Sequence, residues 1–256
     1  MSSGASAEPP ILRMENVSKS FGGILAVRNL TLEVRRGTIH ALIGPNGAGK
    51  TTVFNLVTKF HRPTSGRISF KERDITFMTP SQISRLGMGR SFQISAVFGS
   101  LTALENVRIA LQRFRRDCFA FWKSDKVLGA IDENARALLA LVDIDNLADR
   151  KASELPYGRR RALELATTLA LDPEFLLLDE PMAGIGREDI GRIAALIRRV
   201  AQDRTVLMVE HNLSVVADLS DRITVLARGE ILSEGTYNEV SGDPAVIEAY
   251  MGGADD

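Results

Sequence analysis

The 256-residue sequence lacks the features that mark several large classes of protein. Its single cysteine, Cys118, excludes an internal disulfide and a cysteine-based zinc cluster, and fits a reducing compartment. No apolar run approaches the roughly 20 residues that span a bilayer, and Met1–Pro10 has no apolar core of a signal peptide. Basic and acidic residues both number 32, so no net charge favours nucleic acid or an anionic membrane. We therefore expect a cytosolic protein whose membrane role, if any, depends on partner chains.

A glycine-rich loop is the most informative pattern that is present. Residues 44–51 fit G-x-x-x-x-G-K-[ST], with the apolar run Ile39–Ile43 before them and a helix-like segment from Thr52 after them. This strand, loop and helix order is the context in which the pattern predicts a phosphate cradle rather than a chance glycine turn.

The chemistry of this loop follows from its residue types. Glycines let successive backbone N–H groups and the helix N-terminus face a polyphosphate. Lys50 would reach the β- and γ-phosphates, and the Thr51 hydroxyl would ligate Mg²⁺. The sequence therefore predicts a nucleoside triphosphate and Mg²⁺ as ligands. The expected contacts of this triphosphate are Gly44, Pro45, Asn46, Gly47, Ala48, Gly49, Lys50, Thr51 and Thr52.

A second motif, residues 175–181, is an apolar strand that ends in two carboxylates. Asp179 at the strand tip would hold Mg²⁺ opposite Thr51. Glu180 would act as the general base that polarises the attacking water. An acidic strand-to-loop turn is the plain alternative, but both motifs would lie at the carboxyl edge of one sheet, where α/β folds bind ligands.

The order of elements predicts an α/β nucleotide-binding core interrupted by a helical insertion. Short β-like runs between Ile11 and Arg73 predict an antiparallel patch, and residues 80–170 have helical character. Thr102 and Asp132 are candidate caps of two helices in that region. After Pro173, β and α segments alternate again, with continuous apolar strands typical of a covered parallel sheet.

These motifs, with Val209-Glu210-His211, resemble the ATP-binding subunit of ABC transporters from about Ile11 to Gly252. The resemblance implies an α/β fold, a P-loop NTPase (RecA-like) core with an antiparallel β subdomain and an inserted α-helical subdomain. It implies these boundaries: a single ABC ATPase domain at 11–252, with core 11–84 and 166–240, helical subdomain 85–165 and C-terminal helix 241–252, after a flexible tail at 1–10.

The resemblance also assigns roles to residues outside the two motifs. Phe21 matches the aromatic that stacks on adenine, although it could be ordinary core. Gln93 matches the glutamine that touches the metal and the attacking water. His211 matches the switch histidine at the γ-phosphate, although a lone histidine is usually a capping or structural group. Catalytic roles thus fall to Glu180, His211, Lys50 and Gln93, and metal ligation to Thr51, Gln93 and Asp179.

The segment at the signature position departs from the family pattern Leu-Ser-Gly-Gly-Gln. It contains Pro156, Tyr157, Gly158 and Arg159, which in a head-to-tail dimer would face the ATP of the other subunit. Gly186 stands where many relatives carry an aspartate. Both departures fall at the expected dimer seam, so we hypothesise slower hydrolysis than in typical relatives, or a non-identical partner.

Tyr157, Gly89–Gln93 and the C-terminal tail resemble the branched-chain amino acid importer branch. The resemblance implies an ATPase at the inner face of the cell membrane. Its partners would be a second ATPase subunit (homo- or heterodimer), membrane permease subunits and, indirectly, a periplasmic or extracellular solute-binding protein, with no nucleic acid. Urea and amide importers and the ATPase of lipopolysaccharide export share much of this pattern.

Three alternatives remain open from the sequence. A soluble ABC ATPase without a membrane partner usually has long coiled-coil insertions or two ATPase units, for which this chain has no room. A regulatory module without catalysis is disfavoured by Glu180 and His211. The basic and aromatic segment Gln112–Lys123 fits either a surface near lipid headgroups or a solvated turn.

Overall fold

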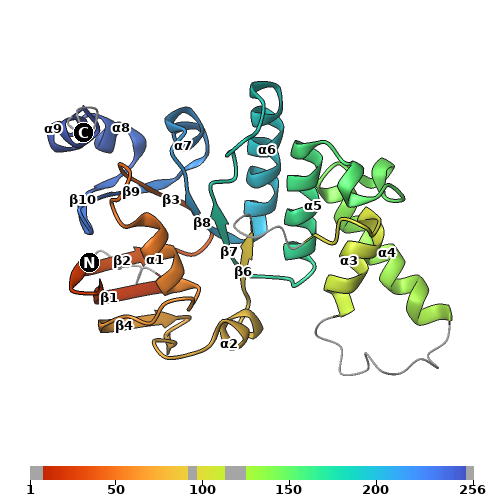
Figure 1. Ribbon diagram of the computed structural model, residues 1–256, viewed down its shortest axis with the longest axis horizontal. Coiled ribbons are helices and arrows are strands. Elements are labelled where there is room, and N and C mark those ends of the chain that lie inside the picture. Colours follow the sequence, from red (N-terminus) through yellow and green to blue (C-terminus); the bar gives the residue numbers. More distant parts are fainter. Residues whose placement is uncertain (1–7, 92–96, 113–124, 252–256) are drawn as a thin grey trace, which may run out of the picture.

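The structure is a computed structural model that describes residues 8–91, 97–112 and 125–251. In the view of Figure 1 the smaller sheet lies below one end of the larger sheet, and a group of helices lies at the other end of the long axis. Within the described ranges, no helix has both the length and the apolar character that crossing a bilayer requires. The α/β P-loop NTPase fold expected from the sequence is confirmed.

The smaller sheet is the antiparallel patch expected near the N-terminus. It has four strands in the order β2-β1-β4-β5, with β1 at Leu12–Phe21, β2 at Ile24–Val34, β4 at Ser65–Phe70 and β5 at Arg73–Asp74. The turn between β1 and β2 contains Gly22 and Gly23, both with positive φ, as tight hairpins require.

The larger sheet carries the glycine-rich loop and the acidic motif. Its six strands run in the order β10-β9-β3-β8-β7-β6. They are β3 at Ile39–Ile43, β6 at Met88–Ser91, β7 at Phe175–Asp179, β8 at Thr205–Val209, β9 at Arg222–Ala227 and β10 at Glu230–Gly235. All neighbours are parallel except the edge pair β9–β10, so the carboxyl ends of five strands lie along one edge.

Alternate residues of the parallel strands enter two different hydrophobic cores. Ile39, Ala41 and Ile43 of β3 pack with the helical side of the molecule. Leu42 of the same strand packs with helix α1 (Lys50–Val57) and with the antiparallel sheet. This two-sided burial is the physical reason that the strands read as continuous apolar runs.

The inserted helices form a separate group at one end of the molecule (Figure 1). They are α3 at Ala103–Gln112, α4 at Asp125–Leu141 and α5 at Tyr157–Leu169, with short 3₁₀ turns at Asp145–Leu147 and Ala152–Glu154. Thr102 caps α3 as predicted, because its hydroxyl accepts a bond from the Glu105 N–H at 3.2 Å. The prediction that Asp132 caps a helix is wrong. Helix α4 begins earlier, and Asp132 lies inside it, paired with Arg108.

The remaining helices flank the larger sheet. They are α2 at Pro80–Arg85, α6 at Arg187–Val200, α7 at Leu213–Leu219, α8 at Tyr237–Ser241 and α9 at Pro244–Met251, with a 3₁₀ turn at Ala201–Asp203. Strand β6 falls inside the range predicted for the helical subdomain, yet it is the edge strand of the larger sheet. The subdomain boundaries themselves stay a prediction.

Candidate functional site

The glycine-rich loop connects β3 to α1 in the conformation that its glycines allow. Gly44, Gly47 and Gly49 have φ values of 148°, 76° and 102°. A Cβ atom on Gly44 would lie 2.1 Å from the carbonyl oxygen of Leu226. Only glycine therefore fits at that position, because the β9 backbone runs directly against the loop.

The positive end of α1 opens onto this loop. Gly49 is the N-cap, and it provides no side-chain hydrogen bond to the first turn. The Lys50 ammonium bends over the loop and donates to the carbonyl oxygens of Gly44 at 2.6 Å and Pro45 at 3.0 Å. Burial lowers the pKa of Lys50, and the nearby Glu180 carboxylate opposes that shift. A glycine-rich backbone, a helix N-terminus and a lysine thus lie together, an arrangement that favours the binding of an anion.

The two carboxylates of the acidic motif stand at the tip of β7. The strand order β3-β8-β7 places them at the same edge as the glycine loop, one strand removed from it. Asp179 ends the strand, and its backbone pairs with Val209 of β8. Glu180 follows with φ of 49°, an unusual backbone conformation for a non-glycine residue.

Arg90 is a site residue whose role the sequence did not reveal. Its guanidinium donates to Asp179 Oδ2 at 2.9 Å and also to Asn55 and Thr58 at the end of α1. Burial raises the pKa of Asp179, and the Arg90 charge opposes that shift. Arg90 therefore links the acidic strand tip to the helix that begins at the glycine loop.

The oxygen donors present fit a small hard cation. Thr51 offers a hydroxyl near the start of α1, and Asp179 offers a carboxylate with one oxygen already bonded to Arg90. Mg²⁺ prefers such oxygen ligands, and it usually keeps several waters and binds phosphate oxygens as well. The third predicted ligand, Gln93, lies outside the described residues.

Two of the other predicted ligand contacts lie on the surface. Phe21 is 41% exposed at the end of β1, so it is not part of the core. Its ring contacts His61 at 5.1 Å between centroids, with the Lys19 ammonium 4.9 Å from it. His211 is exposed and follows β8, the strand between the glycine loop and the acidic motif. Both side chains are therefore accessible from outside the subunit, and their contacts with nucleotide stay a prediction.

The signature residues lie elsewhere in the chain, at the start of α5. Pro156 is the N-cap of this helix, directly before its first residue. The Tyr157 hydroxyl donates to the carbonyl oxygen of Ala183 at 2.9 Å, and it accepts N–H bonds from Arg161. Arg159 donates to the backbone of Asp143, so its charge is engaged within the subunit. Gly158 is buried against Asp189 of α6.

This arrangement separates the signature residues from the glycine loop of the same chain. In Figure 1, α5 lies beyond α6 toward the helical end, whereas α1 lies on the opposite side of the larger sheet. The signature residues instead contact the loop that follows Glu180. The predicted ATP contacts therefore fall into two separate groups on one subunit.

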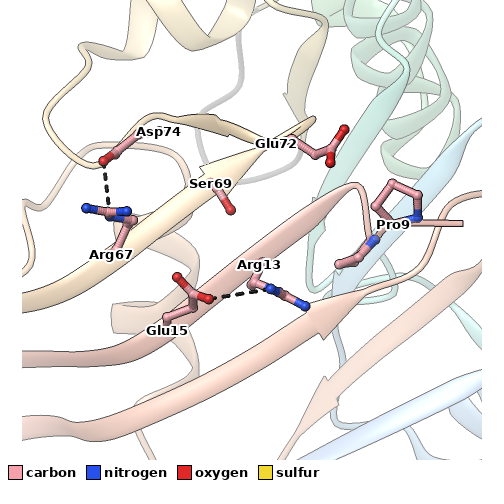
Figure 2. A pocket seen from close by; sticks show the side chains of 8 residues that line it. Pro9, Arg13, Glu15, Arg67, Ser69, Glu72 and Asp74 are labelled. Atoms are coloured by element: carbon pink, nitrogen blue, oxygen red, sulfur yellow. Dashed lines mark ion pairs between the residues drawn. The ribbon is translucent and has the colours of Figure 1, made fainter.

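A hollow of about 290 Å³ lies on the antiparallel sheet (Figure 2). Its lining lacks the glycine loop and the acidic strand tip of the candidate site. Its arginines are paired on the surface, Arg13 with Glu33 at 2.6 Å and Arg67 with Asp74 at 3.3 Å. Exposed pairs of this kind are typical of a solvated sheet face.

Comparisons with known proteins agree with this geometry. A family model described as "ABC transporter" matches residues 27–183, and one described as "Branched-chain amino acid ATP-binding cassette transporter" matches residues 230–256. The high-affinity branched-chain amino acid transport ATP-binding protein LivG of Salmonella typhimurium is 39% identical over 252 residues, covering 96% of this chain and 99% of the relative.

Two solved structures are similar in fold. An ATP-binding cassette of an ABC transporter in its ADP conformation has a TM-score of 0.84 at 31% identity, covering 95% of this chain and 99% of that one. A dimeric bacterial ABC transporter cassette has a TM-score of 0.75 at 25% identity, covering 88% and 98%.

Proposed function

The chain belongs to the ABC transporter family as an ATP-binding subunit, and from this we propose that it powers uptake of branched-chain amino acids through separate membrane permeases. It is an ABC-type ATPase that binds nucleotide. The observation that carries the ATPase function is the convergence of the glycine loop and Lys50 with the acidic tip of β7 along one sheet edge. The substrate class is supported by the C-terminal match at residues 230–256 and by the LivG relative.

The proposed reaction is hydrolysis of the γ-phosphoryl group of ATP by water. Lys50 and the amides of the glycine loop bind the phosphates and stabilise the charge that develops on them. Glu180 orients the attacking water and accepts its proton, and His211 contacts the γ-phosphoryl oxygens. Thr51, Asp179 and Gln93 would hold Mg²⁺, which supplies charge neutralisation across the phosphates when bound.

The site becomes complete in a head-to-tail dimer. ABC ATPase homologues act as dimers with membrane permeases, and the two groups of ATP contacts on one subunit are separate. We propose that Pro156, Tyr157, Gly158 and Arg159 contact the ATP of the opposing subunit. Dimer closure on ATP would drive the permeases between inward- and outward-facing states at the inner face of the membrane.

A groove of about 380 Å³ offers a place for the permease to dock. Phe60, which is 55% exposed, and Ile83 and Met88 provide apolar lining, and Arg90 also lines it. A permease segment in this groove would press on the same arginine that holds Asp179. We propose this contact as the route from transport to hydrolysis. Phe60→Glu should abolish co-purification with the permeases while leaving ATP binding intact.

The decisive experiment reconstitutes the subunit with its permeases, its partner ATPase and the solute-binding protein in liposomes. Leucine, isoleucine or valine should stimulate ATP hydrolysis, and Glu180→Gln should reduce turnover by at least ~100-fold. Stimulation by urea or acetamide alone would favour an amide importer instead. Activity that is indifferent to any permease would favour a soluble ABC ATPase.

The purified subunit without its partners tests the hypothesis of a slow or unequal dimer. Steady-state hydrolysis by the purified subunit is measured across a range of protein concentrations. A rate per subunit that rises to ordinary turnover would mean a competent homodimer, despite Pro156 and Gly186. A negligible rate with intact ATP binding would support dependence on a non-identical partner.

A further inference from the structure

Glu210 is a buried carboxylate that bridges two loops of the candidate site. Its exposed fraction is 0%. Oε1 accepts the backbone N–H of Met182 at 2.9 Å, and Oε2 accepts those of His211 at 2.9 Å and Asn212 at 3.0 Å. One side chain thus holds three backbone donors from two segments that are distant in sequence.

The two segments carry different parts of the proposed chemistry. Met182 lies two residues after Glu180, and His211 directly follows Glu210 itself. The Glu180 N–H also donates to the carbonyl oxygen of Val209 at 2.9 Å. A backbone bond therefore joins the two segments at Glu180 itself, and the Glu210 side chain joins them again two residues later, at Met182.

The use of a carboxylate here is informative because burying one is costly. An unsatisfied buried charge costs several kcal/mol, and only well-made hydrogen bonds offset it. Charge-assisted bonds to N–H groups are roughly twice as strong as neutral ones. A group that served only to fill space at this position would be apolar.

We propose that Glu210 is a positioning residue for ATP hydrolysis. Its carboxylate fixes the His211 loop against the loop that follows Glu180. The side chains of His211 and Glu180 are thereby both directed at the same phosphoryl group. The proposal rests on the proposed roles of Glu180 and His211, and it adds a residue that touches neither ATP nor water. Misplacement of reacting groups by ~1 Å can cost about 100-fold in rate, which sets the scale of the effect.

The test replaces Glu210 with Gln, which keeps the shape but points an amide NH₂ at backbone donors. We expect single-turnover hydrolysis to slow by about 10- to 100-fold, the scale of such misplacement, while ATP affinity changes little. In a His211→Ala background the same change should slow hydrolysis by a smaller factor, because the part of its effect that acts through His211 is already lost.

A matched control is Asn106→Ala in the helical group. Asn106 is 2% exposed, and it holds the backbone of Phe98 and Thr102 through its amide. Asn106→Ala should lower Tm, as Glu210→Gln is also expected to do. In the double variant with His211→Ala, however, the two losses of hydrolysis rate should simply multiply. The proposal is overturned if Glu210→Gln lowers Tm without slowing hydrolysis, or if its rate loss multiplies fully with His211→Ala.

A measurement on the wild-type protein covers the case in which the variant does not fold. The amide protons of Met182, His211 and Asn212 should exchange with solvent as one protected group. Fast exchange of the Met182 amide proton, independent of the other two, would contradict the proposal that the Glu210 carboxylate holds the two loops together. If His211→Ala and Glu180→Gln also leave turnover unchanged, the proposed site roles fail rather than this inference alone.

Discussion

The guanidinium of Arg90 lies 2.9 Å from the carboxylate of Asp179, and their side chains are only 14% and 8% exposed. The pair is therefore a buried ion pair, and one of its members, Asp179, is a predicted metal ligand. Arg90 also lies against the rings of Phe54 and Phe60, at 5.0 and 5.1 Å from their centroids. Arg90 thus contacts the Asp179 carboxylate and two aromatic rings at once.

Loss of this arginine should be costly to stability. Arg90→Met leaves Asp179 buried without its partner, so we expect urea-induced unfolding to show a loss of about 3–5 kcal/mol. In an Asp179→Asn background the cost should fall to less than half, because no charge is then stranded. Arg13→Met, which removes an exposed pair with Glu33, should cost at most about 1 kcal/mol. Equal losses for both arginines would contradict this account.

The close approach at Gly44 predicts a strong effect of a single methyl group. Gly44→Ala would place Cβ 2.1 Å from a β9 carbonyl oxygen, so the loop must distort. We expect ATP affinity, measured with a fluorescent analogue, to fall by more than 10-fold, since a shifted loop misplaces several N–H donors. Gly191→Ala, on an open face of α6, should be neutral or stabilise by up to ~1 kcal/mol. Normal binding by Gly44→Ala would mean that the loop geometry is not limiting.

The Tyr157 hydroxyl should matter for assembly rather than for ATP binding within one subunit. Tyr157→Phe removes the bond to Ala183 that ties the signature helix to the loop after Glu180. In a Glu180→Gln background we expect ATP-induced dimerisation to weaken by about 3- to 10-fold, the scale of one hydrogen bond. Sedimentation velocity with ATP measures this, and Tyr237→Phe is the control. If Tyr157→Phe and Tyr237→Phe dimerise with the same affinity, the bond from Tyr157 to Ala183 does not contribute to assembly.

His40 predicts a pH dependence of stability. It is fully buried on β3, where burial and then the charge of Arg222 lower its pKa to about 4. The unfolded chain binds a proton near pH 6.5, whereas the folded protein does not, so stability falls as the pH drops below 6.5. Between pH 7.5 and 5 we expect a loss of about 2 kcal/mol.

Substitution of individual histidines shows whether His40 causes this pH dependence of stability. Urea unfolding of His40→Gln should lack this part of the pH dependence, while His61→Gln should retain it. A slope that survives in His40→Gln would assign the effect to the carboxylates instead.

Local patterns predicted the parts of the site that are continuous in sequence. The glycine loop lies between its strand and helix, and the acidic pair ends a buried strand, because period and turn chemistry are local properties. The partners of those motifs are not local. Arg90 and Asp179 are 89 residues apart, and Glu210 and Met182 are 28 apart, so strand order alone brings them together. The prediction that Asp132 caps a helix failed because Gly129 interrupts the apolar pattern, although helix α4 continues through it.

The glycine loop is held in shape by segments that are synthesised much later in the chain. Strand β3, which leads into the loop, has only β8 and β9 as neighbours in its sheet. The turn after β9 also supports the loop, since the Gly229 N–H donates to Ala48 and its carbonyl accepts from Arg28. On the ribosome, the loop emerges long before the segments that hold it in shape, and such distant pairings form late. A nascent chain that stops short of Gly229 would therefore carry the full glycine motif and still have no place for ATP.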